Sequence, residues 1–323
     1  MNFKQLYNDL NSWCISKTNF NLRSYLRLIG LGTLGYAFYS LLQNAKLLVP
    51  HDLSQRYGRD SWAIVTGASD GIGRAFCEEL TKDGFNIILI ARTRSKLEAT
   101  VKRLKEIRKD VKTKIILADF SNGDQPGFYE DLLNELDDYD ISLLINNVGM
   151  ETMDCFENID LMFLKDLIVV NTLAVVTLTK FIINRAKDRK YHSGIINIAS
   201  LSSVRPLPYF STYAASKRFT HIFTKAVARE YKDSDKLDIL SCQPGYVTTN
   251  MTAQKKSFET IPPNRAARIY LNRLGRTDHA IGYYIHKMTE FTLKCPLPNF
   301  ALRFTLKKEM NRRKKYHGHE IIL

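Results

Sequence analysis

The chain has 323 residues, 45% of them hydrophobic and 25% charged, as expected for a globular protein with one large core and shorter appendages. Its formal net charge is +14, of which +4 falls in residues 1–57 (six Lys and Arg against two Asp) and +5 in residues 301–323 (seven against two Glu). No zinc-finger spacing, RNA-binding motif or basic stripe with interleaved aromatic residues accompanies this charge, so the pattern argues against a nucleic-acid partner and favours an anionic membrane surface.

The cysteines indicate a reducing compartment. They are odd in number and widely spaced, without any Cys-x-x-Cys pattern, so free thiols are expected instead of a disulfide framework. His317 and His319 lie in a basic tail with no third ligand nearby, and no metal site is predicted. The five cysteines are Cys14, Cys77, Cys155, Cys242 and Cys295.

Residues 28–45 form an uncharged stretch between Arg27 and Lys46. The stretch is short for a membrane span, which takes about 20 apolar residues, and glycines and polar side chains dilute it. Three aromatic residues give it the character of a membrane interface. We interpret residues 1–57 as an N-terminal membrane-anchor region whose helix either spans a bilayer or lies in its interface. A helix packed on the protein's own domain is the alternative.

From residue 61 onward, short apolar runs alternate with helical patterns. Such runs are typical of strands that are buried on both faces of a parallel sheet. The predicted fold is therefore α/β: a doubly wound parallel sheet of the Rossmann type, forming a single domain over residues 58–250. Strands are expected at 63–66, 87–90, 115–117, 143–145, 195–198 and 237–240, and helices at 71–80, 96–107, 127–136, 160–186 and 211–231.

Residues 251–323 interrupt this alternation and form the third expected region. Several prolines surround one helical stretch near 264–274. We expect a substrate lid here, followed by a basic C-terminal extension; the sequence gives no evident signal for a final strand of the sheet.

A glycine-rich turn, Thr-Gly-Ala-Ser-Asp-Gly-Ile-Gly, occupies residues 66–73 after the first predicted strand. In a Rossmann sheet this turn lets the backbone approach the pyrophosphate of a dinucleotide, and the amides of the next helix face the anion. A plain strand-to-helix turn is the alternative, but the strand before it and the helix after it favour a cofactor site. The predicted cofactor residues in the turn are Gly67, Ser69, Asp70, Gly71, Ile72 and Gly73.

The end of the second predicted strand indicates which dinucleotide is bound. NAD-selective sites usually place an acidic residue here to hold the ribose 2′-hydroxyl. This chain has Ala91 instead, followed by Arg92 and Arg94. A guanidinium group pairs with a 2′-phosphate, so we predict NADPH with Arg92 as its contact. The alternative is that one or both arginines are solvated loop charges, which suits Arg94 better than Arg92.

Ser200, Tyr213 and Lys217 carry the predicted chemistry. Tyr213 and Lys217 lie four residues apart in a helical pattern and therefore share one helix face. A free phenol has a pKa near 10, and we expect the Lys217 ammonium to lower that pKa. Ser200 ends a predicted strand, where it can hydrogen-bond the substrate oxygen. Tyr213 would then be the general acid in reduction and the general base in oxidation. Lys217 could also hold the nicotinamide ribose hydroxyls, and both Tyr213 and Lys217 are predicted to contact the cofactor.

Together these motifs resemble the short-chain dehydrogenase/reductases over about residues 60–250. The likeness rests on the glycine turn, on Asn-Asn-Val-Gly at 146–149, on Ser200, on Tyr-Ala-Ala-Ser-Lys at 213–217 and on Gln-Pro-Gly at 243–245.

The resemblance implies roles for further residues. It gives Asp119 a contact with the adenine amine and Asn146 a structural place on the adenine side. It gives Asn171 a water in a proton relay to Lys217, and Thr249 a contact with the nicotinamide carboxamide.

The resemblance narrows to one branch of the family. That branch holds very-long-chain 3-oxoacyl-CoA reductases, 17β-hydroxysteroid dehydrogenases of types 3 and 12, and hydroxysteroid dehydrogenase-like proteins. Residues 91–97, 146–149 and 282–286 carry the likeness, whereas residues 150–156 depart from it.

The branch implies an NADPH-dependent reduction of a ketone on a lipophilic substrate at the endoplasmic reticulum membrane. A 3-oxoacyl-CoA and a 17-ketosteroid are both open as that substrate. A catalytically inactive dinucleotide-binding scaffold is the alternative function, and a homodimer is an open alternative to a monomer.

Overall fold

The computed structural model describes residues 3–18, 21, 24, 27, 28, 30–32, 34, 35, 52–234, 236–254, 257, 259–294 and 299–317. The chain divides into two compact units, Met1–His51 and Asp52–Leu323. The first unit contains helix α1 (Phe3–Thr18). Most of the stretch 28–45, which we interpreted as a membrane anchor, lies outside the described residues.

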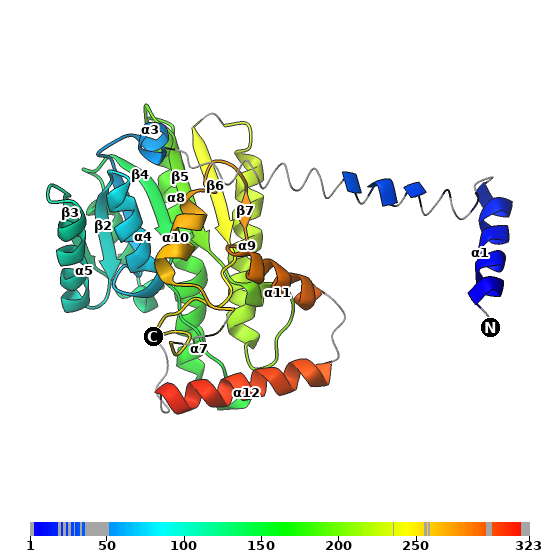
Figure 1. Cartoon of the computed structure of the whole chain (residues 1–323). Helices are drawn as coiled ribbons and strands as arrows, with labels where there is room; N and C mark the ends of the chain where they lie inside the picture. The colour runs from blue at the N-terminus through cyan, green and yellow to red at the C-terminus, as the bar shows by residue number, and fades with distance from the viewer. Residues whose placement is uncertain are drawn as a thin grey trace. The chain divides into compact units, whose positions relative to one another are not determined.

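The second unit is built on a seven-stranded parallel sheet in the order β3-β2-β1-β4-β5-β6-β7 (Figure 1). The strand order reverses at β1, which confirms the predicted doubly wound α/β fold. The strands are β1 (Trp62–Thr66), β2 (Asn86–Ala91), β3 (Thr113–Leu117), β4 (Ile141–Asn146), β5 (Ser193–Ile198), β6 (Leu237–Cys242) and β7 (His279–Ala280).

Helices cover both faces of the sheet. Helices α3, α4, α5 and α10 pack on one face, and α6, α7, α8 and α9 pack on the other. Their bounds are α3 (Leu53–Tyr57), α4 (Gly71–Lys82), α5 (Arg94–Ile107), α6 (Phe128–Asn134), α7 (Leu161–Ile168), α8 (Ala174–Ala186), α9 (Ser211–Glu230) and α10 (Pro263–Leu271).

Successive residues along a strand join two different hydrophobic cores. Ala63 and Val65 of β1 pack with α4 and α5, whereas Ile64 between them packs on the opposite face. Both faces exclude water, so the strands show no polar alternation and read in the sequence as continuous apolar runs.

Helix α3 belongs to the second unit, although the sequence-based division put it in the N-terminal region. Tyr57 is fully buried, and its hydroxyl donates a hydrogen bond to Oδ2 of Asp238 at 2.8 Å. Arg56 donates two hydrogen bonds to the same carboxylate, at 2.7 and 2.9 Å. These contacts hold the segment that precedes β1 against β6.

The predicted helix at 160–186 contains an irregular turn. It consists of α7, a π-helical turn at Val169–Leu173, and α8. Among the described residues this is the one helix long and apolar enough to cross a membrane by length and composition. It packs against β4 and β5 in the core of the second unit, so sheet packing accounts for its apolar character.

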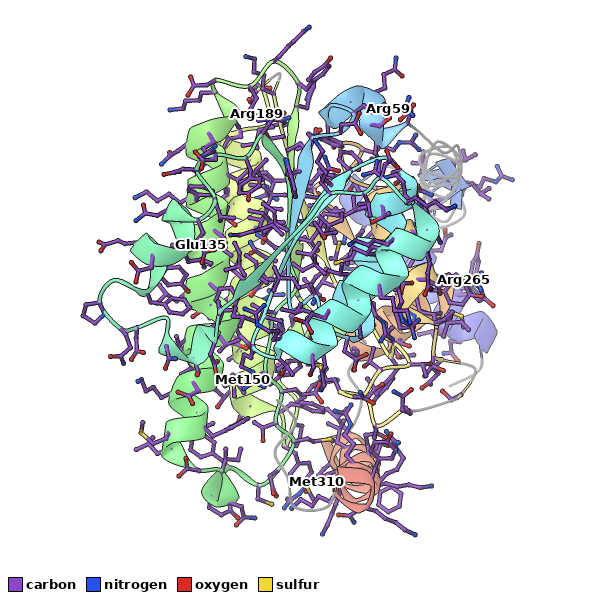
Figure 2. The ribbon with its side chains drawn as sticks, turned by 90° about the vertical axis from the view of Figure 1, so that its left-hand side faces the viewer. Arg59, Glu135, Met150, Arg189, Arg265 and Met310 are labelled. Atoms are coloured by element: carbon purple, nitrogen blue, oxygen red, sulfur yellow. The ribbon has the colours of Figure 1, made fainter. Side chains whose placement is uncertain are left out.

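Three further elements follow α10 among the described residues. The two-residue strand β7 pairs with β6 and adds a final strand that was not evident in the sequence, because two residues give no apolar run to detect. Helices α11 (Tyr284–Lys294) and α12 (Asn299–His317) follow. Helix α12 lies across the carboxyl-terminal end of the sheet (Figure 1). In Figure 2, Met150 lies toward the end that carries Met310 of α12, and Arg59 and Arg189 lie at the opposite end.

Candidate active site

A cavity of about 870 Å³ lies at the carboxyl-terminal end of the sheet. Its lining comes from the glycine turn, from the segments that follow β2, β3, β4, β5 and β6, and from helices α9, α11 and α12. Segments that follow the early strands and residues of the later helices therefore line one cavity. It lies at the end of the sheet where doubly wound folds bind their ligands.

The glycine turn forms a close-fitting cradle at one end of the cavity. Gly67 and Gly71 have left-handed backbone conformations (φ of +65° and +55°), which glycine adopts without strain. A Cβ atom on Gly73 would lie 2.2 Å from the carbonyl oxygen of Gly67, so only glycine fits there. Gly67, Ser69, Asp70, Gly71 and Ile72 line the cavity, and Gly73 lies behind them.

Asp70 and Thr249 hold the cradle against the loop after β6. The Asp70 carboxylate accepts a hydrogen bond from the Gly71 amide at 2.7 Å and one from Nδ2 of Asn250 at 2.6 Å. Thr249 lines the cavity, and its Cγ2 lies 3.1 Å from the position of a Cβ on Gly71. Both predicted residues thus lie at the cofactor end.

Of the two adjacent asparagines at the end of β4, the second reaches the cavity. Asn147 lines it, and its Nδ2 donates to the carbonyl oxygen of Thr66 at 3.0 Å. Asn146 is buried outside the lining, where its Nδ2 donates to Oδ1 of Asn197 at 2.8 Å. The structure therefore does not bring Asn146 to the cavity; it joins β4 to β5. Sequence reasoning missed Asn147, although it lies in the same motif.

A cationic corner lies at the ends of β2 and β3. Arg92 and Asp119 both line the cavity, with 3.7 Å between Nη1 and Oδ2 and about 40% of each side chain exposed. Lys96, on the first turn of α5, lines the same corner and was missed, although it lies four residues after Arg92. Arg94 lies outside the lining beside Glu98, which matches a solvated position.

The structure brings Ser200 and Tyr213 together. Both line the cavity, and the Ser200 hydroxyl forms a hydrogen bond with the Tyr213 phenol. Ser200 follows β5 by two residues, and its Oγ accepts a hydrogen bond from the Ser202 amide at 3.1 Å. Tyr213 lies on the first turn of α9 and is buried.

Lys217 lies one turn further along α9 and also lines the cavity. Its Nζ donates to the carbonyl oxygen of Ile198 at 3.0 Å and lies 6.0 Å from the centroid of the Tyr213 ring. Burial lowers the pKa of Lys217 to about 8 and raises the pKa of Tyr213 to about 12. The expected lowering of the phenol pKa is therefore wrong: desolvation of the phenolate dominates, and the ammonium bonds a backbone carbonyl.

Asn171 lies in the π-helical turn, fully buried, and fixes the loop after β4. Its Oδ1 accepts from the Met150 amide at 2.8 Å, and its Nδ2 donates to the Met150 carbonyl at 2.9 Å and to Oγ of Ser216 at 2.9 Å. A Cβ on Gly149 would lie 3.0 Å from Nζ of Lys217 and 3.2 Å from Oδ1 of Asn171. Asn171 thus packs beside Lys217, with its amide held by protein groups.

Helix α12 lines the other end of the cavity with both apolar and charged side chains. Leu302 and Leu306 of α12 face inward, one turn apart. Arg312 donates to the carbonyl oxygens of Thr252 and Ala253 at 2.9 and 3.3 Å, which ties the helix to the loop after β6. The sequence predicted a lid and a basic extension here, but not that the extension itself lines the cavity.

Comparison with known proteins decides the family. Residues 61–260 match the model of the family described as short chain dehydrogenase. The chain belongs to this family of oxidoreductases.

Two similar relatives agree with this assignment. The hydroxysteroid dehydrogenase-like protein 1 of Gallus gallus is 36% identical over 278 residues, which cover 83% of this chain and 82% of the relative. The protein of Caenorhabditis elegans named very-long-chain 3-oxooacyl-coA reductase let-767 is 33% identical over 281 residues, covering 84% and 87%.

A solved structure shows the same fold. It belongs to a study of 7beta-hydroxysteroid dehydrogenase stereoselectivity and matches with a TM-score of 0.68 at 21% identity, covering 81% of this chain and 99% of the other.

Proposed function

We propose that the protein is an NADPH-dependent oxidoreductase that reduces a ketone on a lipophilic substrate. One observation carries the proposal: the hydrogen-bonded Ser200 and Tyr213, together with Lys217, line the same cavity as the glycine turn and Arg92. A proton donor and a dinucleotide cradle are the two parts that hydride transfer to a carbonyl requires.

The residues at the cofactor end fit NADPH. The glycine cradle leaves room for a pyrophosphate against the backbone, at the start of α4, where helix amides favour an anion. Arg92 and Lys96 are cations at the corner where a 2′-phosphate would lie, and Ala91 offers no carboxylate to repel it. When bound, this cofactor supplies the hydride.

Tyr213 supplies the proton. Because burial raises its pKa to about 12, the phenol stays protonated at neutral pH and can donate to the carbonyl oxygen as negative charge develops there. The Ser200 hydroxyl, already bonded to the phenol, would hydrogen-bond the same oxygen. Lys217, largely protonated at pH 7, would stabilise the phenolate that remains.

The substrate end supports a lipophilic ketone. Its lining includes Leu207, Phe210, Leu293, Leu302 and Leu306, which would enclose an apolar body around the reacting carbonyl. The names of the relatives, a 3-oxoacyl-CoA reductase and a hydroxysteroid dehydrogenase-like protein, fit such substrates. We propose a 3-oxoacyl-CoA or a 17-ketosteroid as the substrate class.

The outer faces of α11 and α12 support a membrane surface as partner, and we propose the endoplasmic reticulum. Tyr284, Met288 and Phe291 follow one another on one side of α11 and are 60–70% exposed. Phe300 and Phe304 of α12 are at least 75% exposed. Aromatic side chains beside a basic helix are suited to an anionic interface. Co-sedimentation with vesicles that contain anionic lipid, against neutral vesicles, tests this part.

The activity is tested with the purified full chain in detergent. NADPH oxidation is followed at saturating cofactor with long-chain 3-oxoacyl-CoA esters and 17-ketosteroids. Turnover of one class supports the proposal and identifies the substrate. Tight NADPH binding without turnover of either class would contradict it and favour a dinucleotide-binding scaffold.

A further inference from the structure

A buried ion pair joins α12 to the loop after β4 at the substrate end of the cavity. Arg313 of α12 pairs with Glu151, and both residues are more than nine-tenths buried. Nε of Arg313 also donates to Oε1 of Glu309 at 3.0 Å, so one guanidinium bridges two carboxylates. All three residues line the cavity that contains Tyr213.

On the carboxylate side, Glu151 is next in sequence to the residue that hydrogen-bonds Asn171. Glu151 directly follows Met150, whose amide and carbonyl both hydrogen-bond the Asn171 side chain. A displacement of Glu151 would therefore pull on the backbone that Asn171 holds beside Lys217.

On the arginine side, the pair packs against the phenol through one aromatic ring. The Arg313 guanidinium lies 5.5 Å from the centroid of the Phe210 ring, within the range of a cation–π contact. The Phe210 ring in turn lies 5.8 Å from the Tyr213 ring. Arg313 of α12 thus contacts Phe210, whose ring packs beside the Tyr213 phenol.

Burial makes the two charges depend on each other. An ionic group away from water is stable only while its partner and its hydrogen bonds replace the lost hydration. A second ion pair, Lys314 with Asp154 at 2.6 Å, joins the same two segments, but its side chains are 39% and 23% exposed. Solvent screens such a pair, so it should contribute little. The exposed Lys314–Asp154 pair therefore serves as a control for the buried Glu151–Arg313 pair.

We propose that Glu151 and Arg313 are positioning residues that hold α12 over the substrate end of the cavity and keep Asn171 and Tyr213 in their reactive arrangement. The kinetic part of this inference rests on the ketone reduction proposed above; the closure by α12 does not. Among the described contacts of these two residues, none involves the glycine turn, Arg92 or Asp119. Loss of the pair should therefore affect the substrate and leave the cofactor alone.

The test compares Glu151→Gln with Asp154→Asn in the full chain. We expect Glu151→Gln to raise KM for the ketone and the rate of trypsin cleavage within the basic α12 by about tenfold or more, as loss of one partner of a buried pair implies. The dissociation constant of NADPH, measured by fluorescence, should stay within about twofold of wild type. Asp154→Asn should match wild type in all three measurements.

A charge exchange separates the ion pair from general packing. Glu151→Arg alone should open α12 to trypsin, and the added Arg313→Glu should restore most of the resistance. If Glu151→Gln does not fold, Glu151→Asp and the exchanged pair provide the same comparison. Wild-type KM and cleavage rates in Glu151→Gln, or no restoration by the exchange, overturn the proposal. If no ketone is reduced, the trypsin and NADPH measurements still decide whether the pair closes α12.

Discussion

Lys217 donates a hydrogen bond from Nζ to the carbonyl oxygen of Ile198, 3.0 Å away at the last residue of β5. This contact fixes the ammonium to the end of the sheet, beneath the phenol that precedes it by one turn of α9. Because Lys217 is buried, its pKa falls to about 8. A group that titrates so close to neutrality should make the reaction sensitive to mild alkali.

The first prediction is a loss of activity above pH 8. The cationic form of Lys217 stabilises the developing phenolate, and deprotonation removes that charge. We expect kcat/KM for ketone reduction to decline with one apparent pKa near 8. A pH–rate profile between 6.5 and 10, with stability checked by circular dichroism, measures this. A flat profile across the range would show that the charge on Lys217 is not needed.

Tyr213→Phe should abolish most turnover while the cofactor still binds. The substitution removes one hydroxyl and keeps the buried ring against Phe210. We expect kcat to fall by about 10²-fold or more, the usual scale for loss of a general acid, with an unchanged dissociation constant for NADPH. Tyr209→Phe, in the preceding loop and outside the lining of the cavity, is the matched control and should retain activity.

Arg92→Asp should change the choice of cofactor. A carboxylate at this position repels a 2′-phosphate and can accept from a ribose hydroxyl instead. We expect the affinity for NADPH to fall by about 10- to 100-fold and that for NADH to change little, as measured by fluorescence titration. Arg94→Asp should leave both affinities near wild type. Equal losses for the two cofactors in Arg92→Asp would rule out phosphate recognition by this residue.

The burial of His221 leads us to predict that the folded protein loses stability in mild acid. It is buried, with Nδ1 2.9 Å from Oγ of Ser241, and burial lowers its pKa from 6.5 to about 4. Between these values the unfolded chain binds more protons than the folded one, so stability falls as the pH decreases from about 6.5 to 4. The loss from this residue is on the order of 2 kcal/mol. Urea denaturation at pH 7 and 4.5 measures it, and His221→Asn should reduce the pH dependence.

The burial of Tyr57 leads us to predict that the second unit depends on residues before 58 for its stability. Its side chain is fully buried beside Gly194 of β5 and Gly275 in the turn after α10, and its hydroxyl donates a hydrogen bond to Asp238. We expect Tyr57→Ala to lower the free energy of unfolding by about 3 to 5 kcal/mol. Tyr57→Phe removes one hydrogen bond and should cost about 1 kcal/mol. A Tyr57→Ala variant as stable as wild type would place α3 outside the cooperative unit.

The parts of this fold that the sequence predicted are those governed by local pattern. Six strands were predicted because residues such as Ile64 and Ile88 are buried whichever face they point to. The glycine turn was recognisable because it is one short run of sequence, and Tyr213 and Lys217 because they lie one turn apart on α9. Ser200 lies after β5, and its fixed spacing from Tyr213 along the chain made it recognisable. Strand β7 was missed because two residues carry no pattern.

The remaining features depend on contacts between distant segments. The Glu151–Arg313 pair joins residues 162 positions apart, and neither sequence neighbourhood indicates the other. The pKa of Tyr213 was predicted in the wrong direction because spacing places Lys217 on the same helix face but does not report how far burial outweighs its charge. Asn146 and Asn147 are adjacent, and the sequence does not show that Asn146, the last residue of β4, bonds Asn197 of β5 whereas Asn147 lines the cavity.

Because of the π-helical turn at Val169–Leu173, the number of residues in this helix cannot change without moving side chains out of the core. Such a turn holds one residue more than regular α-helix would, and each residue advances the helix by about 100°. Shortening the turn by a single residue would rotate everything before it, so that Phe163 and Leu167 would leave the interior. Most surface loops tolerate an insertion or deletion of one residue. In this turn, the same change would disturb the packing of the half of the protein that surrounds the reacting groups.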